Sequence, residues 1–121
     1  MLFRSEATLT HVIPAGPEIL TPFQSEGNPP VVDPAACVIS WAPVTQTIDG
    51  SHALVISGYQ LIVEQDSPKR VFSVDVPASV TSLRVPREFF AQRNTLHKFE
   101  VLAVESGGNQ TITEGEFVTA P

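Results

Sequence analysis

The segment Cys37-Val38-Ile39-Ser40-Trp41-Ala42-Pro43 decides the fold of this chain. Its alternate residues Cys37, Ile39 and Trp41 are apolar and share one face of a strand, because side chains along a strand alternate between its two faces. A later segment, residues 96–104 (LHKFEVLAV), repeats this alternation with histidine, phenylalanine and valine on one face. We predict that the two strands lie in facing sheets, with the only tryptophan of the chain between them.

Length and composition predict one all-β domain rather than a helical or disordered chain. Hydrophobic residues make up 42% and charged residues 17% of the 121 residues, which allows one packed core. The 11 prolines and 7 glycines are spread along the chain and divide it into short segments, a spacing that disfavours long helices.

Seven segments have the composition and length of strands, with turn-forming residues between them about every 8–12 positions. They are residues 18–21, 36–41, 53–65, 71–76, 81–85, 96–105 and 110–119. This spacing predicts a seven-stranded antiparallel immunoglobulin-like β-sandwich. The turn at residues 66–69 predicts a hairpin, and Gly58 predicts a bulge or a sharp entry into the third strand. Residues 88–91 could form one helical turn, with a phenylalanine closing the base of the core.

Ten side chains are predicted to fill the space between the sheets. They are Cys37, Ile39, Trp41, Tyr59, Leu61, Phe72, Leu83, His97, Phe99 and Val101. Packing alone must hold this core, because a single cysteine excludes an internal disulfide. The thiol is interpreted as a small buried filler rather than a reactive group or a zinc ligand.

Residues 1–16 are predicted to be an N-terminal extension, and residues 17–121 the domain. The run Thr8–Ile13 is β-like, and Pro14-Ala15-Gly16-Pro17 after it cannot continue a strand ladder. Two interpretations stay open: a flexible tail, or the last strand of a preceding module with its linker. The second is favoured because the run is more β-like than a random tail.

The charge balance disfavours two classes of partner. Seven basic and 13 acidic residues give a net charge of −6, which repels phosphate backbones and anionic membranes. No stretch is apolar enough to span a bilayer, and the N-terminus lacks a signal-peptide pattern. We expect protein partners, no nucleic acid, no membrane insertion, and a monomer when the domain is isolated.

Three motifs resemble those of the fibronectin type III family. They are residues 39–43 (ISWAP) near the end of the second strand, residues 57–61 (SGYQL) opening the third, and residues 99–109 (FEVLAVESGGN) on the sixth strand and its turn. The resemblance covers about residues 17–120. In order, and with the right strands between them, the three motifs are more specific than any one alone.

Two positions depart from the family pattern. His97 stands where the family has the tyrosine of its corner, and its shorter ring is expected to alter that corner. The corner segment also lacks the usual Leu-x-Pro-Gly, so Phe89 or Phe90 takes the place of the leucine. A histidine that is buried in its neutral form makes stability depend on pH, because protonation then opposes folding.

The resemblance implies a non-catalytic spacer or protein-binding module of a larger secreted or cell-envelope protein, in tandem with other domains. A cytoplasmic location stays open. The alternative is an accessory domain of a secreted carbohydrate-active or other hydrolytic enzyme, with catalysis elsewhere in the parent chain. A small stand-alone enzyme is the least favoured hypothesis. The Arg-Gly-Asp tripeptide that the family uses in adhesion is absent.

No motif predicts a catalytic, cofactor-binding or metal-ligating residue. The three histidines lack metal-ligand spacing, and neither Gly-x-Ser-x-Gly nor a phosphate loop is present. The loop aspartates lack Asp-x-Asp-x-Asp spacing, so calcium binding stays open with little support. The glutamates are interpreted mostly as solvated positions; those considered are Glu64, Glu88, Glu100, Glu105, Glu114 and Glu116.

Two loops are the predicted interaction surface. The family's loops between its second and third strands and between its sixth and seventh strands cluster at one end of the sandwich. In this chain they are residues 44–55 and 106–110. The candidate interaction residues are Asp49, Ser51, His52, Gly107 and Asn109. Asn109-Gln110-Thr111 also matches the N-glycosylation pattern.

Overall fold

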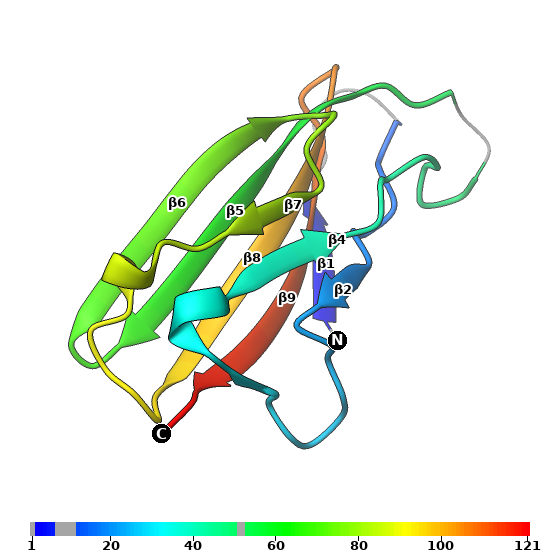
Figure 1. Cartoon of the computed structure of the whole chain (residues 1–121). Coiled ribbons are helices and arrows are strands. Elements are labelled where there is room, and N and C mark those ends of the chain that lie inside the picture. Colours follow the sequence, from blue (N-terminus) through cyan, green and yellow to red (C-terminus); the bar gives the residue numbers. More distant parts are fainter. Residues whose placement is uncertain (1, 7–11, 51–52) are drawn as a thin grey trace.

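The two strands that decide the fold lie in different sheets of one β-sandwich (Figure 1). The computed structural model describes residues 2–6, 12–50 and 53–121. The smaller sheet has the order β2 (Ile19–Thr21), β4 (Val38–Trp41), β7 (Ser82–Arg84). The larger sheet has the order β1 (Leu2–Glu6), β9 (Gln110–Thr119), β8 (Leu96–Glu105), β5 (Ile56–Asp66), β6 (Lys69–Pro77), and β3 (Val31–Val32) also pairs with β9. Two 3-10 turns, η1 (Pro34–Ala36) and η2 (Arg87–Phe89), complete the described elements.

Each of the seven predicted segments contains a strand, but the predicted count and pairing need correction. The structure adds β1 and β3, which gives nine strands in two sheets over residues 2–6, 12–50 and 53–121. The pairing of β3 with β9 is parallel, so the larger sheet is mixed rather than purely antiparallel. β3 has only two residues inside a proline-rich loop, too few to show the alternation on which strand prediction depends.

The structure describes a strand, β1, before the predicted β-like run at the N-terminus. The run Thr8–Ile13 falls largely on residues 7–11, which lie outside the described residues. The strand that the structure describes, β1, pairs antiparallel with β9 from Leu2 opposite Glu114 to Glu6 opposite Gln110. The division into an extension and a domain at residue 16 stays a prediction.

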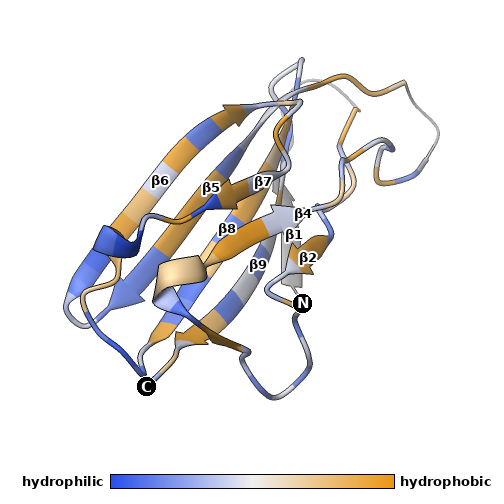
Figure 2. Ribbon diagram, in the orientation of Figure 1, coloured by the Kyte–Doolittle hydropathy of each residue, from blue (hydrophilic) through white to orange (hydrophobic). Residues whose placement is uncertain are grey.

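The core lies between the two sheets and is centred on Trp41, whose side chain is 1% exposed. Its indole makes an edge-to-face contact with Tyr59 of the larger sheet, with ring centroids 5.5 Å apart. Alternating bands of apolar and polar residues along β5 and β6 (Figure 2) show the inward and outward faces. Eight of the ten predicted core residues are buried: Cys37, Ile39, Trp41, Tyr59, Leu61, His97, Phe99 and Val101. Phe72 and Leu83 are partly buried and pack against this cluster.

The predicted hairpin and the bulge at Gly58 are confirmed, while the helical turn predicted at residues 88–91 is a 3-10 turn at Arg87–Phe89. β5 and β6 form the expected hairpin, with Asp66 opposite Lys69. The pairing of β5 with β8 shifts register just before Gly58. Phe89 of η2 is buried at the base of the core, and the Arg70 guanidinium lies 5.6 Å from the centre of its ring.

We predict that Trp41→Ala lowers the free energy of unfolding by about 3–5 kcal/mol, because it removes the largest side chain between the sheets. Val38→Ala on the outward face of the same strand, where the side chain is 38% exposed, serves as the control and is expected to cost less than about 1 kcal/mol. Urea denaturation of both variants measures the difference. Equal costs for the two variants would place the indole outside the core.

Candidate functional site

The two predicted interaction loops meet at one end of the sandwich. The Ser106 amide donates a hydrogen bond to the Val55 carbonyl over 2.9 Å, which joins the end of one loop to the start of the other. Asp49 and Gly107 are exposed on this end. Ser51 and His52 lie outside the described residues. The Asp49 carboxylate accepts a hydrogen bond of 2.9 Å from the Thr47 hydroxyl of its own loop.

Asn109 corrects the predicted interaction surface, because its side chain is fully buried. Its Nδ2 donates a hydrogen bond of 2.8 Å to the Val12 carbonyl, and its backbone amide donates to the Glu105 carboxylate over 3.2 Å. Nδ2 is also the atom to which an N-linked glycan would attach. In the folded domain this atom is enclosed, so Asn109 is neither a surface contact nor an accessible glycosylation site.

The residues before β2 are held against this end of the sandwich. The Thr111 hydroxyl donates to the Pro14 carbonyl over 2.6 Å, next to the bond from Asn109 to Val12. The Ala15 amide donates to the Gln46 carbonyl over 2.9 Å, and the Ile48 amide to the Ile13 carbonyl over 2.8 Å. We call residues 12–15 with these partners the N-terminal clamp. Two polar residues at alternate, inward positions, Asn109 and Thr111, are the sequence signal for this clamp. The same two residues match the N-glycosylation pattern, so the pattern alone does not distinguish the two roles.

The described residues offer little for chemistry. Among them, no three His, Cys, Asp or Glu side chains are grouped so that they could hold a metal ion. Cys37 is fully buried, and burial raises the pKa of its thiol to about 12, so the thiolate that a nucleophile needs is not formed near neutral pH. Within the parts of the chain that the structure describes, no helix is long and apolar enough to cross a membrane.

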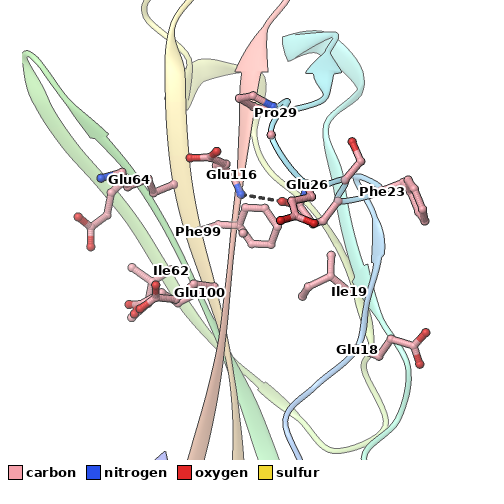
Figure 3. A pocket seen from close by; sticks show the side chains of 16 residues that line it. Glu18, Ile19, Phe23, Glu26, Pro29, Ile62, Glu64, Phe99, Glu100 and Glu116 are labelled. Carbon is pink, nitrogen blue, oxygen red and sulfur yellow. Dashed lines mark hydrogen bonds between the residues drawn. The ribbon is translucent and has the colours of Figure 1, made fainter. Parts of the chain in front are cut away.

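A groove of about 800 Å³ lies beside β9, between its residues 114–116 and the loop at residues 23–29. Outward-facing side chains of β5 and β8 extend it across the larger sheet. In Figure 3, Glu64 and Glu18 lie on opposite sides of Phe99. Six carboxylates line it: Glu18, Glu26, Glu64, Glu100, Glu114 and Glu116. We call this feature the acidic groove.

Gln24 holds the outer wall of the acidic groove in place. Its Oε1 accepts a hydrogen bond of 2.9 Å from the Glu116 amide, and its Nε2 donates to the Pro22 carbonyl over 2.9 Å. With Gln24 fixed, Phe23 beside it is left 75% exposed at the rim of the groove. No periodic pattern in the sequence indicates this wall, because it depends on one polar side chain in an irregular loop.

Solved structures show what this arrangement is similar to. The fibronectin type III domain of the human collagen α-1(XX) chain has a TM-score of 0.57 and 17% identity, over 95% of this chain and 90% of that chain. The third fibronectin III domain of the human KIAA0343 protein has a TM-score of 0.54 and 16% identity, over 95% of this chain and 90% of that chain. The chain has the fibronectin type III fold.

A third similar structure, of a myokine, has a TM-score of 0.54 and 12% identity, over 90% of this chain and 97% of that chain. No protein-family model matches the sequence, and no curated protein matches it. Identities this low carry the fold alone. The fibronectin type III fold was therefore read correctly from its three motifs, while the residues of its surfaces have to be argued from this chain.

His97 takes the corner position of the fibronectin type III fold and is fully buried. The imidazole does reach a backbone carbonyl: its Nδ1 lies 3.0 Å from the Thr95 oxygen and, since a carbonyl only accepts, Nδ1 carries the proton. The ring stacks on Phe117, with centroids 5.2 Å apart and planes 6° apart. Phe89 and Phe90 contact it edge-on. Nε2 has no hydrogen-bond partner among the described residues.

This environment favours the neutral ring. Desolvation by burial lowers the pKa of His97 from its usual 6.5, and the hydrogen bond to Thr95 opposes that shift only in part. A proton on Nε2 would be enclosed by aromatic rings without an acceptor. In the unfolded chain the same group titrates near its usual value. The unfolded state therefore binds more protons below about pH 6.5, and acid favours unfolding.

We predict that the free energy of unfolding falls as the pH drops below about 6.5 and is unaffected by His97 above that value. His97→Phe keeps an aromatic ring and removes the titrating nitrogen, so the difference between wild type and variant isolates this residue from the carboxylates. Urea denaturation between about pH 5 and 8 measures it. Parallel pH dependences for the two proteins would contradict the prediction.

Proposed function

We propose that this domain is a non-catalytic spacer or protein-binding module of a larger secreted or cell-envelope protein. The fibronectin type III fold supports a binding or spacer role. Two of the similar structures are single domains of larger human chains, one of them a collagen chain. Burial raises the pKa of the Cys37 thiol, whereas a reactive thiol requires a lowered pKa. This agrees with a module that leaves catalysis to other domains of the parent chain.

The observation that carries the spacer role is that hydrogen bonds fasten the segment before β2 to one end of β9 and the segment after β9 to the other end. The N-terminal clamp binds residues 12–15 beside the start of β9. At the other end of the same strand, the Thr119 hydroxyl accepts from the Thr95 amide, and the Thr119 amide donates to the Thr95 carbonyl, each over 3.0 Å. The Ala120 amide donates to the Val32 carbonyl over 2.8 Å.

These two attachments lie at opposite ends of β9, and Figure 1 shows the C-terminus at the other end of the sandwich from the turn between β8 and β9. A pull between residues 12 and 121 therefore runs along the long axis of the domain. It loads hydrogen bonds at both ends before it reaches the core. Such an arrangement suits a module that keeps neighbouring domains at a fixed separation.

We predict that the domain, pulled between a cysteine at position 12 (Val12→Cys) and one added after Pro121, unfolds in a single event. The unfolded chain between the two cysteines has an extended length of roughly 360–400 Å, and the step equals this length less their separation in the folded domain. Buried Cys37 does not compete for the attachment chemistry. Asn109→Ala combined with Thr111→Val is expected to lower the unfolding force, because it removes both side-chain bonds of the clamp.

The control pairs Asn28→Ala with Thr45→Val, which make the same chemical changes at exposed positions. Single-molecule force spectroscopy measures all three proteins. Several low-force steps in the wild type, or equal effects of the two double variants, would argue against a mechanical spacer.

A further inference from the structure

The acidic groove holds most of the net charge of the chain. Among the lining residues that the structure describes, six belong to the 13 acidic residues of the chain and one, Lys98, to its seven basic residues. The groove therefore carries a net charge of −5 within a chain of net charge −6. The rest of the sequence is nearly balanced. A charge excess concentrated in one hollow creates a local potential that attracts cations and steers their approach.

Strand register explains how the carboxylates come together. On the outer face of the larger sheet, Lys98 of β8 lies opposite Glu64 of β5 and opposite Glu116 of β9. Two residue pairs further, and therefore on the same face, Glu114 lies opposite Glu100. Adjacent strands are about 4.8 Å apart, so three neighbouring strands place their carboxylates within about 10 Å. Glu18 and Glu26 add charge from the loop side.

The groove also offers apolar surface. Among the side chains that the structure describes, Phe23 is the most exposed large apolar one, at 75%. The hydrogen bond from the Glu116 amide to Gln24 Oε1 holds this loop against β9, and the bond from Gln24 Nε2 to the Pro22 carbonyl lies within the loop. Ile62 lies half-buried in the same lining, beside the carboxylates of β5 and β8. An aromatic face next to carboxylates suits an ammonium or guanidinium group on an apolar stem.

We propose that the acidic groove binds an extended, basic segment of another polypeptide, in which lysine or arginine residues alternate with apolar residues. Charge complementarity selects the cationic residues, while Phe23 and Ile62 contact the apolar ones. The length of the hollow, from the loop at residues 23–29 across to β5, accommodates an elongated ligand rather than one ion. The inference rests on the protein-binding role proposed above and names the chemistry of the partner.

A fluorescein-labelled ten-residue peptide of alternating lysine and valine is the probe, and its glutamate–valine counterpart is the negative control. Fluorescence anisotropy with the full chain at 150 mM salt is expected to show saturable binding of the basic peptide only. Glu64→Gln, Glu114→Gln and Glu116→Gln together are expected to weaken binding about tenfold. Phe23→Ala alone is expected to weaken it about threefold.

The matched control removes the same charge outside the groove: Asp66→Asn, Asp75→Asn and Glu88→Gln, all at exposed positions. It is expected to change the dissociation constant less than about twofold. Equal losses in the two triple variants would reduce the effect to diffuse charge attraction and overturn the proposal. Circular dichroism of each variant establishes that it is folded before it is titrated.

Two further outcomes would overturn the inference in favour of another occupant. Saturable binding of calcium chloride alone, lost in the groove variant, would assign the groove to a divalent cation. A concentration-dependent dimer in sedimentation, lost in the same variant, would assign it to a second copy of this chain. Any of these failures leaves the single unfolding event under force unaffected, so the groove and the spacer role are tested separately.

Discussion

The contact between Trp41 and Tyr59 joins the two sheets, and the geometry of the loop end depends on it. The indole comes from the smaller sheet and the phenol from the larger one, with ring centroids 5.5 Å apart. The Tyr59 hydroxyl also accepts a hydrogen bond of 2.9 Å from the Val44 amide. One aromatic pair therefore fixes the spacing of the layers and the starting point of the loop at residues 44–55, whose backbone then binds residues 13 and 15.

A second constraint is that the backbone groups along the outer edge of β9 need partners. Strand edges with free backbone groups promote aggregation, and folded proteins cover or interrupt them. Here β1 covers residues 110–114, the side chain of Gln24 binds the amide of Glu116, and β3 covers residues 118–119. The outer wall of the acidic groove is thus part of the structure that protects this edge. Gly115 lies between the stretches that β1 and β3 cover and is paired with Phe99 of β8. A Cβ on residue 115 would come within 2.7 Å of the Cε1 atom of the Phe99 ring.

Periodic apolar positions made most of the fold predictable. Cys37, Ile39 and Trp41 alternate with polar residues, and that alternation alone assigns them to an inward face. The additional strands were not predictable in the same way. β3 is two residues long. β1 pairs with the edge of β9, and that edge exists only when β9 is already paired in the sheet. The register, rather than local sequence, decides where such segments bind.

The surfaces were harder to predict because they depend on single polar side chains. Asn109 was assigned to an exposed turn, and the structure buries it because Val12 and Glu105 bind it from both sides. Glu105 was interpreted with the solvated glutamates, yet it is 4% exposed. Glu64, Glu114 and Glu116 are at least partly exposed, but only the pairing of three strands reveals that they share one hollow.

Trp41 is the only tryptophan, so the intrinsic fluorescence of the chain reports directly on the contact that joins the sheets. Acrylamide quenching of the native protein, compared with the urea-unfolded protein, is the most direct measurement. A blue-shifted emission and a strongly reduced quenching constant in the native state are the predicted result. An emission maximum and quenching constant equal to those of the unfolded chain would show that the indole faces water, and that no sandwich closes over it.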